Sequence, residues 1–166
     1  MPAFPRDEYL QRLTRTKAKM AERGFDVLMV IDPSNIFYLT GYDGRSAYVP
    51  QALFVLADEE EPRLVVRAMD VPGGTAFMGD THIHGYPEDY IAHGRLHPFD
   101  YFGDLLRTWG VAAKRFGIEL DFTTPGGWER IRQARRTRDH RCRGARGRRR
   151  CRGDGGAGAR SAGFRR

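Results

Sequence analysis

The 166-residue chain has little cysteine and no long apolar run. Its two cysteines, Cys142 and Cys151, lie close to the carboxyl terminus, so the rest of the chain has no disulfide to form. That usage fits a reducing compartment. No stretch approaches the ~20 apolar residues that cross a bilayer, and the amino terminus lacks the apolar segment of a secretory signal. We therefore expect a soluble, cytoplasmic protein without a membrane partner.

Several short motifs of enzymes are also missing. No glycine-rich phosphate loop follows a predicted strand, and there is no nucleophile elbow. The pairs Gly73-Gly74 and Gly126-Gly127 are isolated, and we interpret them as breaks in secondary structure. The acidic residues are numerous, but none are paired at a spacing typical of an acid/base couple. The sequence therefore gives no catalytic residue.

Large apolar side chains nearly disappear after about residue 134. Residues 135–166 contain 13 Arg and two Asp, a net charge of +11, and Phe164 is their only large apolar side chain. Residues 1–134 carry a net charge of −4. Ordering such a tail costs ~1.5 kcal/mol per residue, roughly 50 kcal/mol in all, which this composition cannot offset. We expect one domain over 1–134 and a disordered basic tail over 135–166, arising from a frameshift or another truncation of a longer protein.

Hydrophobic periodicity in residues 1–134 indicates an α/β domain. The continuous apolar run 27–31 predicts a strand that is buried on both faces. Ser34 and Asn35 are suitable caps for a helical turn over 36–39. Further patterns predict helices over 7–23, 98–109 and 125–131, and strands over 52–57, 63–67, 81–86 and 115–120. The strands at 52–57 and 63–67 form a hairpin, so we predict a mixed sheet with flanking helices.

The stretch Asp-Pro-Ser-Asn-Ile-Phe-Tyr-Leu-Thr-Gly-Tyr-Asp-Gly, residues 32–44, resembles a signature of the amino-terminal domain of the creatinase/prolidase hydrolases. Four further blocks, in the same order, are similar to the branch that contains ectoine hydrolase and Xaa-Pro peptidases: residues 5–9, 20–24, 48–51 and 67–70. The likeness runs from about Phe4 to about Gln133. It implies the fold of that amino-terminal, non-catalytic domain.

The resemblance also implies where the chemistry takes place. Family members hydrolyse C–N bonds in a second domain, with two metal ions held by two Asp, one His and two Glu, or with a histidine and no metal in creatinase-like branches. Those positions have no counterpart here, so we expect no cofactor and no hydrolysis from this chain alone, and a divalent metal in full-length relatives. The family's domain typically packs across a dimer, so the expected partner is a second copy or a catalytic domain.

Arg67 is the leading candidate for a binding residue. It ends a predicted apolar strand, and a planar guanidinium there suits a substrate carboxylate in the neighbouring subunit. A plain surface ion pair with Asp70 is the alternative. The residues on a neighbouring loop that could complete a polar pocket are Tyr42, Asp43, Tyr48 and Gln51.

Other candidate ligands have weaker support. His82 and His84 point to one face of the predicted strand 81–86 and could hold a metal, but no third ligand is in view. The spacing of His140, Cys142 and Cys151 matches no zinc module. We therefore predict no metal site. The alternative function is nucleic-acid binding by the Arg/Gly tail, which would neutralise phosphates. No aromatic residue interleaves with its arginines before Phe164, so we expect only weak, incidental binding of polyanions.

Overall fold

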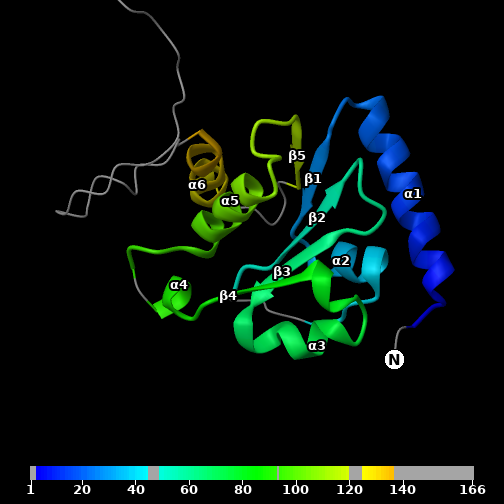
Figure 1. The fold of residues 1–166 in the computed structure, drawn as a ribbon, viewed down its shortest axis with the longest axis horizontal. Coiled ribbons are helices and arrows are strands. Elements are labelled where there is room, and N and C mark those ends of the chain that lie inside the picture. Colours follow the sequence, from blue (N-terminus) through cyan, green and yellow to red (C-terminus); the bar gives the residue numbers. More distant parts are fainter. Residues whose placement is uncertain (1–2, 45–48, 93, 120–124, 137–166) are drawn as a thin grey trace, which may run out of the picture.

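The computed structural model describes residues 3–44, 49–92, 94–119 and 125–136 (Figure 1). The sequence-predicted tail therefore lies outside the described residues from residue 137 onward, as does Tyr48. The described helices are α1 (Arg6–Glu22), α2 (Pro33–Thr40), α3 (Val71–Thr75), α4 (Asp89–Ala92), α5 (Pro98–Thr108) and α6 (Pro125–Arg136). The strands are β1 (Val27–Val30), β2 (Ala52–Leu56), β3 (Arg63–Arg67), β4 (Ile83–Tyr86) and β5 (Phe116–Ile118), and two 3₁₀ turns cover Ala68–Asp70 and Asp80–His82.

The strands form a five-stranded mixed sheet in the order β4-β3-β2-β1-β5. β2 is antiparallel to both of its neighbours, whereas β3–β4 and β1–β5 are parallel. The sequence prediction of a mixed-sheet α/β domain with an internal hairpin is thus confirmed. The described helices include none that is long and apolar enough to cross a membrane.

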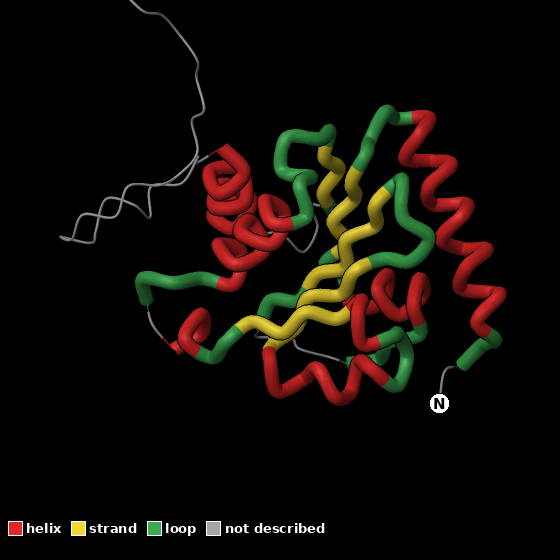
Figure 2. Tube along the Cα trace, viewed as in Figure 1, coloured by secondary structure: helices red, strands yellow, loops and turns green. Residues whose placement is uncertain are grey.

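Helices cover both faces of the sheet (Figures 1 and 2). On one face, α5 and α6 bury Phe102, Leu106 and Ile131 in one apolar cluster with Phe54 of β2. On the other face, α1 and α2 bury their apolar sides in a second cluster with Leu53 and neighbouring strand residues. Because successive side chains of a strand point to opposite faces, β2 supplies both cores and is buried along its whole length.

The turn after β1 is built differently from the prediction. Ser34 and Asn35 are not caps but lie inside α2, and the cap is Asp32, whose Oδ1 accepts hydrogen bonds from their backbone N–H groups at 2.6 and 3.3 Å. Pro33 explains the shift, because its fixed φ suits the first helical position and leaves the residue before it as the cap. Gly41 ends the helix with φ +78°, as expected.

Both glycine pairs were wrongly interpreted as breaks. Gly73 and Gly74 lie within α3, and Gly126 and Gly127 lie within α6. At Gly74 and Gly127 the reason is space: an added Cβ would stand 2.9 Å from the Ile83 side chain and 2.0 Å from the Phe99 ring, respectively. Glycine at these two positions permits close packing.

Candidate functional site

Four strands send their carboxyl ends to the same end of the sheet. β1, β3, β4 and β5 run in one direction, and β2 begins where they end. Open α/β sheets usually hold their sites at this end. Arg67 and the described residues of the candidate loop, Tyr42, Asp43 and Gln51, lie on segments at this end, so we describe the site from here.

Arg67 is the last residue of β3 and is paired in register with Tyr86 of β4. β4 forms the edge of the sheet, so Arg67 lies at a strand end, one strand inward from that edge. Its side chain is 17% exposed. Its Nε lies 3.3 Å from Glu88 Oε1 and 3.8 Å from Asp70 Oδ2, so an ion pair with Asp70 is present but the nearer carboxylate is Glu88.

The Arg67 guanidinium forms ion pairs but donates few hydrogen bonds. Its buried Nε has no hydrogen-bond partner, although Glu88 Oε1 lies 3.3 Å away. Its Nη2 contacts the sulfur of Met69, and a thioether is a weak acceptor. Within the described ranges, Arg67 thus gives no hydrogen bond to a protein oxygen, and its fork keeps donor capacity.

Tyr86 fixes this strand end and was missed by the sequence reasoning. Its side chain is fully buried, and its hydroxyl donates a 2.6 Å hydrogen bond to the carbonyl of Pro50, just before β2. Burial raises the pKa of Tyr86, Asp70 and Glu88 add to this and Arg67 opposes it, so the hydroxyl remains a donor. The alternation of residues 81–86 was the only signal that could have marked it as an inward-facing residue.

The loop residues predicted to complete the pocket have different roles. Tyr42 is buried with its ring 6.2 Å from the Phe77 ring, and burial, followed by Asp70 and Asp43, raises the pKa of the Tyr42 hydroxyl. Gln51 is buried and donates to the carbonyl of Gly44 at 3.1 Å, so its amide holds the loop. Asp43 is exposed. Among the described residues, the hydrogen bonds and ion pairs of Tyr42 and Gln51 do not reach Arg67, and Tyr48 lies outside them.

The predicted pairing of His82 with His84 on one strand face is wrong. His82 closes a 3₁₀ turn, and only His84 lies in β4, where its ring packs 5.0 Å from the Trp109 ring centroid. The part of the chain that the structure describes brings together no group of three or more His, Cys, Asp or Glu side chains suited to a metal. Those residues do not fit the family's metal site, and His140 and both cysteines lie beyond them.

Comparison with known proteins identifies the domain. The family model described as the creatinase/prolidase N-terminal domain matches residues 12–141. The chain belongs to the creatinase/prolidase N-terminal domain family. This confirms the resemblance to that family, whose matched range includes residues 32–44. Binding of polyanions by the Arg/Gly tail stays a prediction, because most of that tail is outside the described residues.

Relatives of this creatinase/prolidase domain include hydrolases and peptidases. Ectoine hydrolase of Halomonas elongata is 42% identical over 125 residues, which are 71% of this chain but 30% of that protein. A proline dipeptidase structure from Streptococcus pneumoniae TIGR4 matches with a TM-score of 0.62 and 25% identity, covering 77% of this chain and 87% of that one. The N-terminal domain of the cytoplasmic peptidase PepQ from Mycobacterium tuberculosis H37Rv has the same fold, with a TM-score of 0.57, 22% identity and coverage of 75% and 84%. The chain thus spans about 30% of the ectoine hydrolase that it matches.

Proposed function

We propose that this domain serves a cytoplasmic C–N bond hydrolase of the creatinase/prolidase family as its dimerisation and substrate-positioning domain. In this role Arg67 binds a carboxylate of the substrate that is held by the catalytic domain of a neighbouring subunit. The observation that carries the proposal is the unused hydrogen-bonding capacity of the Arg67 guanidinium at the carboxyl end of the strands.

The surroundings of Arg67 support exchange of its partner. Glu88 is the nearest carboxylate, and its side chain is 55% exposed, so it can move into water when another carboxylate arrives. Because the Glu88 end of this ion pair is exposed to solvent, exchanging Glu88 for another carboxylate costs less than breaking a fully buried pair. The backbone of Arg67 pairs with Tyr86 of β4, and β3 itself lies between β2 and β4, which keeps the guanidinium in a defined position before the substrate binds.

Two exposed apolar side chains, on segments that follow β3 and β4, support a protein partner at this end of the sheet. Met69 follows β3 and Ile91 lies on α4 after β4, and both are large, exposed hydrophobic residues. Apolar and arginine side chains at the centre of a patch are typical of protein interfaces. A second copy of the chain or a catalytic domain would cover them.

The bond-breaking groups belong to that catalytic domain. Metal-activated water, or a histidine in metal-free branches, would supply the chemistry there. The contribution of this domain is to bind and orient a charged group of the substrate, which raises the rate by holding the scissile bond in a reactive geometry. Arg67 takes no part in proton transfer.

A chimera tests the proposal. Residues 1–136 are joined to the catalytic domain of Halomonas elongata ectoine hydrolase, and kcat/KM is measured with Arg67 intact, as Ala and as Lys. Loss of one partly buried charged contact costs ~2–4 kcal/mol, so Arg67→Ala should lower kcat/KM by roughly 30- to 1000-fold. Arg67→Lys should recover part of it, because the charge remains but the planar fork is lost.

The matched control is Arg23→Ala, an exposed arginine at the end of α1, which should leave kcat/KM unchanged. Arg63, on the same strand as Arg67, is unsuitable because its guanidinium stacks 4.7 Å above Trp109 and pairs with Glu59, so its removal would disturb packing. Equal, small effects of Arg67→Ala and Arg23→Ala would leave Arg67 as an ordinary ion-pair residue.

A further inference from the structure

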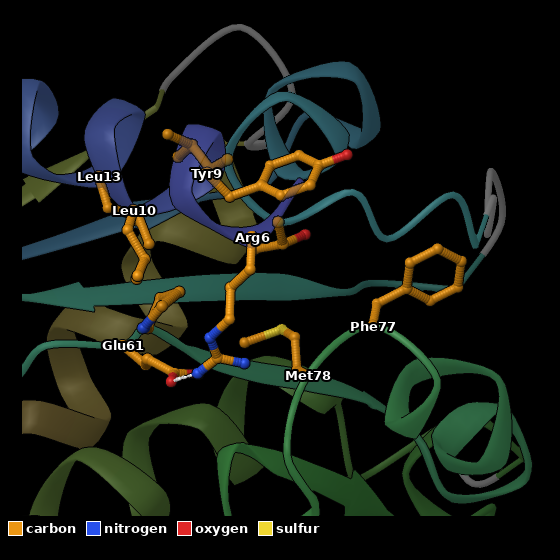
Figure 3. A pocket seen from close by; sticks show the side chains of 10 residues that line it. Arg6, Tyr9, Leu10, Leu13, Glu61, Phe77 and Met78 are labelled. Carbon is orange, nitrogen blue, oxygen red and sulfur yellow. Dashed lines mark hydrogen bonds and ion pairs between the residues drawn. The ribbon is translucent and has the colours of Figure 1, made fainter. Parts of the chain in front are cut away.

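A cavity of about 190 Å³ lies on the sheet face that α1 and α2 cover (Figure 3). It opens between α1, the end of α2, the turn before β3 and the segment after α3. Its apolar wall consists of Leu10, Leu13, Leu39 and Met78. Pockets for drug-sized ligands measure ~300–1,000 Å³, so this one fits a smaller molecule.

Two opposite charges stand at this cavity. Arg6, in the first turn of α1, reaches to Glu61 beside Met78 and forms an ion pair with it (Figure 3). The Arg6 side chain is 64% exposed and that of Glu61 is 20% exposed. An exposed pair contributes only ~0–1 kcal/mol, so a ligand that satisfies both charges can open it at little cost.

The other polar groups in the lining are already engaged. Thr40 Oγ1 donates to the Ile36 carbonyl at 2.7 Å and accepts from the Tyr42 backbone N–H at 3.1 Å. The Tyr9 hydroxyl accepts from the Phe4 backbone N–H at 3.2 Å. Arg6 and Glu61 are the charged residues of the lining, so recognition of a charged ligand group would fall to them.

We propose that this cavity binds an apolar α-amino acid in its zwitterionic form. The ligand's carboxylate pairs with the Arg6 guanidinium, and its ammonium group pairs with the Glu61 carboxylate. Its apolar side chain packs against Leu10, Leu13 and Met78. A zwitterion returns one partner to each member of the opened ion pair, whereas a simple acid or amine would leave one of them unpaired. An amino acid with a charged side chain is disfavoured, because that charge would be buried without a partner. This site does not depend on the role of Arg67.

The test is a titration of the full 166-residue chain with L-leucine, followed by amide chemical shifts of ¹⁵N-labelled protein. We expect saturable shifts at Leu10, Leu13 and Met78. Two probes each keep one charged group of leucine: 4-methylpentanoate carries only the carboxylate, and isoamylamine carries only the ammonium group. Each should bind about tenfold or more weakly than leucine, because one charged contact is lost.

Variants test the same assignment from the protein side. Arg6→Gln and Glu61→Gln should each weaken leucine binding about tenfold or more, and neither disturbs a buried side chain. Arg15→Gln, an exposed arginine on the same helix, is the matched control and should change nothing. The proposal is overturned if leucine causes no saturable shift, if either half-ligand binds as tightly as leucine, or if Arg6→Gln and Arg15→Gln behave alike.

Discussion

The Glu119 carboxylate accepts a 2.8 Å hydrogen bond from the backbone N–H of Asp32, 87 residues earlier in the chain. The same oxygen accepts from the Ile31 N–H at 2.8 Å, and the Asn35 side-chain amide donates to the other oxygen. A residue that follows β5 thus closes the turn between β1 and α2. The family signature at residues 32–44 is held in place by a carboxylate from outside it.

Replacing Glu119 should destabilise the domain measurably. Glu119→Ala removes hydrogen bonds to a charged acceptor and leaves backbone donors without it, so we expect a loss of about 2–3 kcal/mol in the free energy of unfolding. Glu119→Gln should cost less, because the amide oxygen still accepts. Urea denaturation measures both. Glu22→Ala, which breaks only an exposed pair with Lys19, is the control, and a Glu119→Ala effect no larger than this one would contradict the prediction.

Acid should destabilise the domain through His84 and His97. Burial lowers the pKa of both imidazoles; Arg63 and His82 lower that of His84 further, and Arg130 lowers that of His97 against an opposing effect of Asp100. Unfolded histidine keeps a pKa of about 6.5, so below that value the unfolded state binds more protons and stability falls with pH. The loss is complete once pH has passed below the folded-state pKa values.

For His97 the cause is also structural, since its Nδ1 accepts the Phe99 backbone N–H at 3.2 Å and caps α5. Protonation would remove this acceptor. Unfolding free energies between about pH 5 and 7, above the range of ordinary carboxylates, should fall with acid in the native chain. The double variant His84→Gln, His97→Asn should have a flatter profile. A profile as steep as that of the native chain would show that other groups are responsible.

Two glycine-to-alanine changes should have opposite effects. Gly127→Ala places a Cβ 2.0 Å from the buried Phe99 ring, and overpacking of this kind costs ~1–3 kcal/mol, more than the gain in helix propensity. Gly73→Ala in α3 meets nothing within 4 Å and should stabilise by ~0.5–1 kcal/mol. Thermal unfolding of both variants tests the pair. If both variants changed stability in the same direction, helix propensity alone or packing alone would determine the effect, and the prediction would be wrong.

The main elements of the fold followed from the sequence because local patterns determine them. The apolar run at 27–31 gave β1, and the 3.6-residue period of Phe102, Leu105 and Leu106 gave α5. The Glu119 contact could not be found this way, because it joins segments that only the β1–β5 pairing brings together. The close approach of Gly127 to Phe99 could not be predicted for the same reason, because the sequence of a glycine pair does not show which helix packs on it.

The candidate site was predictable in position but not in detail. Arg67 was placed at a strand end by the apolar run before it, and the structure agrees. That Glu88 lies nearer than Asp70 depends on the parallel pairing of β3 with β4, which no sequence spacing encodes. Gln51 was expected to help complete a binding pocket, but it is buried and its side-chain amide donates a hydrogen bond to the Gly44 carbonyl.

The parallel pairing of β1 with β5 has a consequence for the order in which the chain folds. Val27 and Phe116 are register partners separated by most of the domain, whereas β2 and β3 are joined by a short turn. Closing a long loop has a larger entropic cost than closing a short one, so the hairpin should form before β5 docks. In stopped-flow experiments, Leu64→Ala should slow refolding, whereas Glu119→Ala should mainly speed unfolding. The last strand to join the sheet would then set the lifetime of the native state.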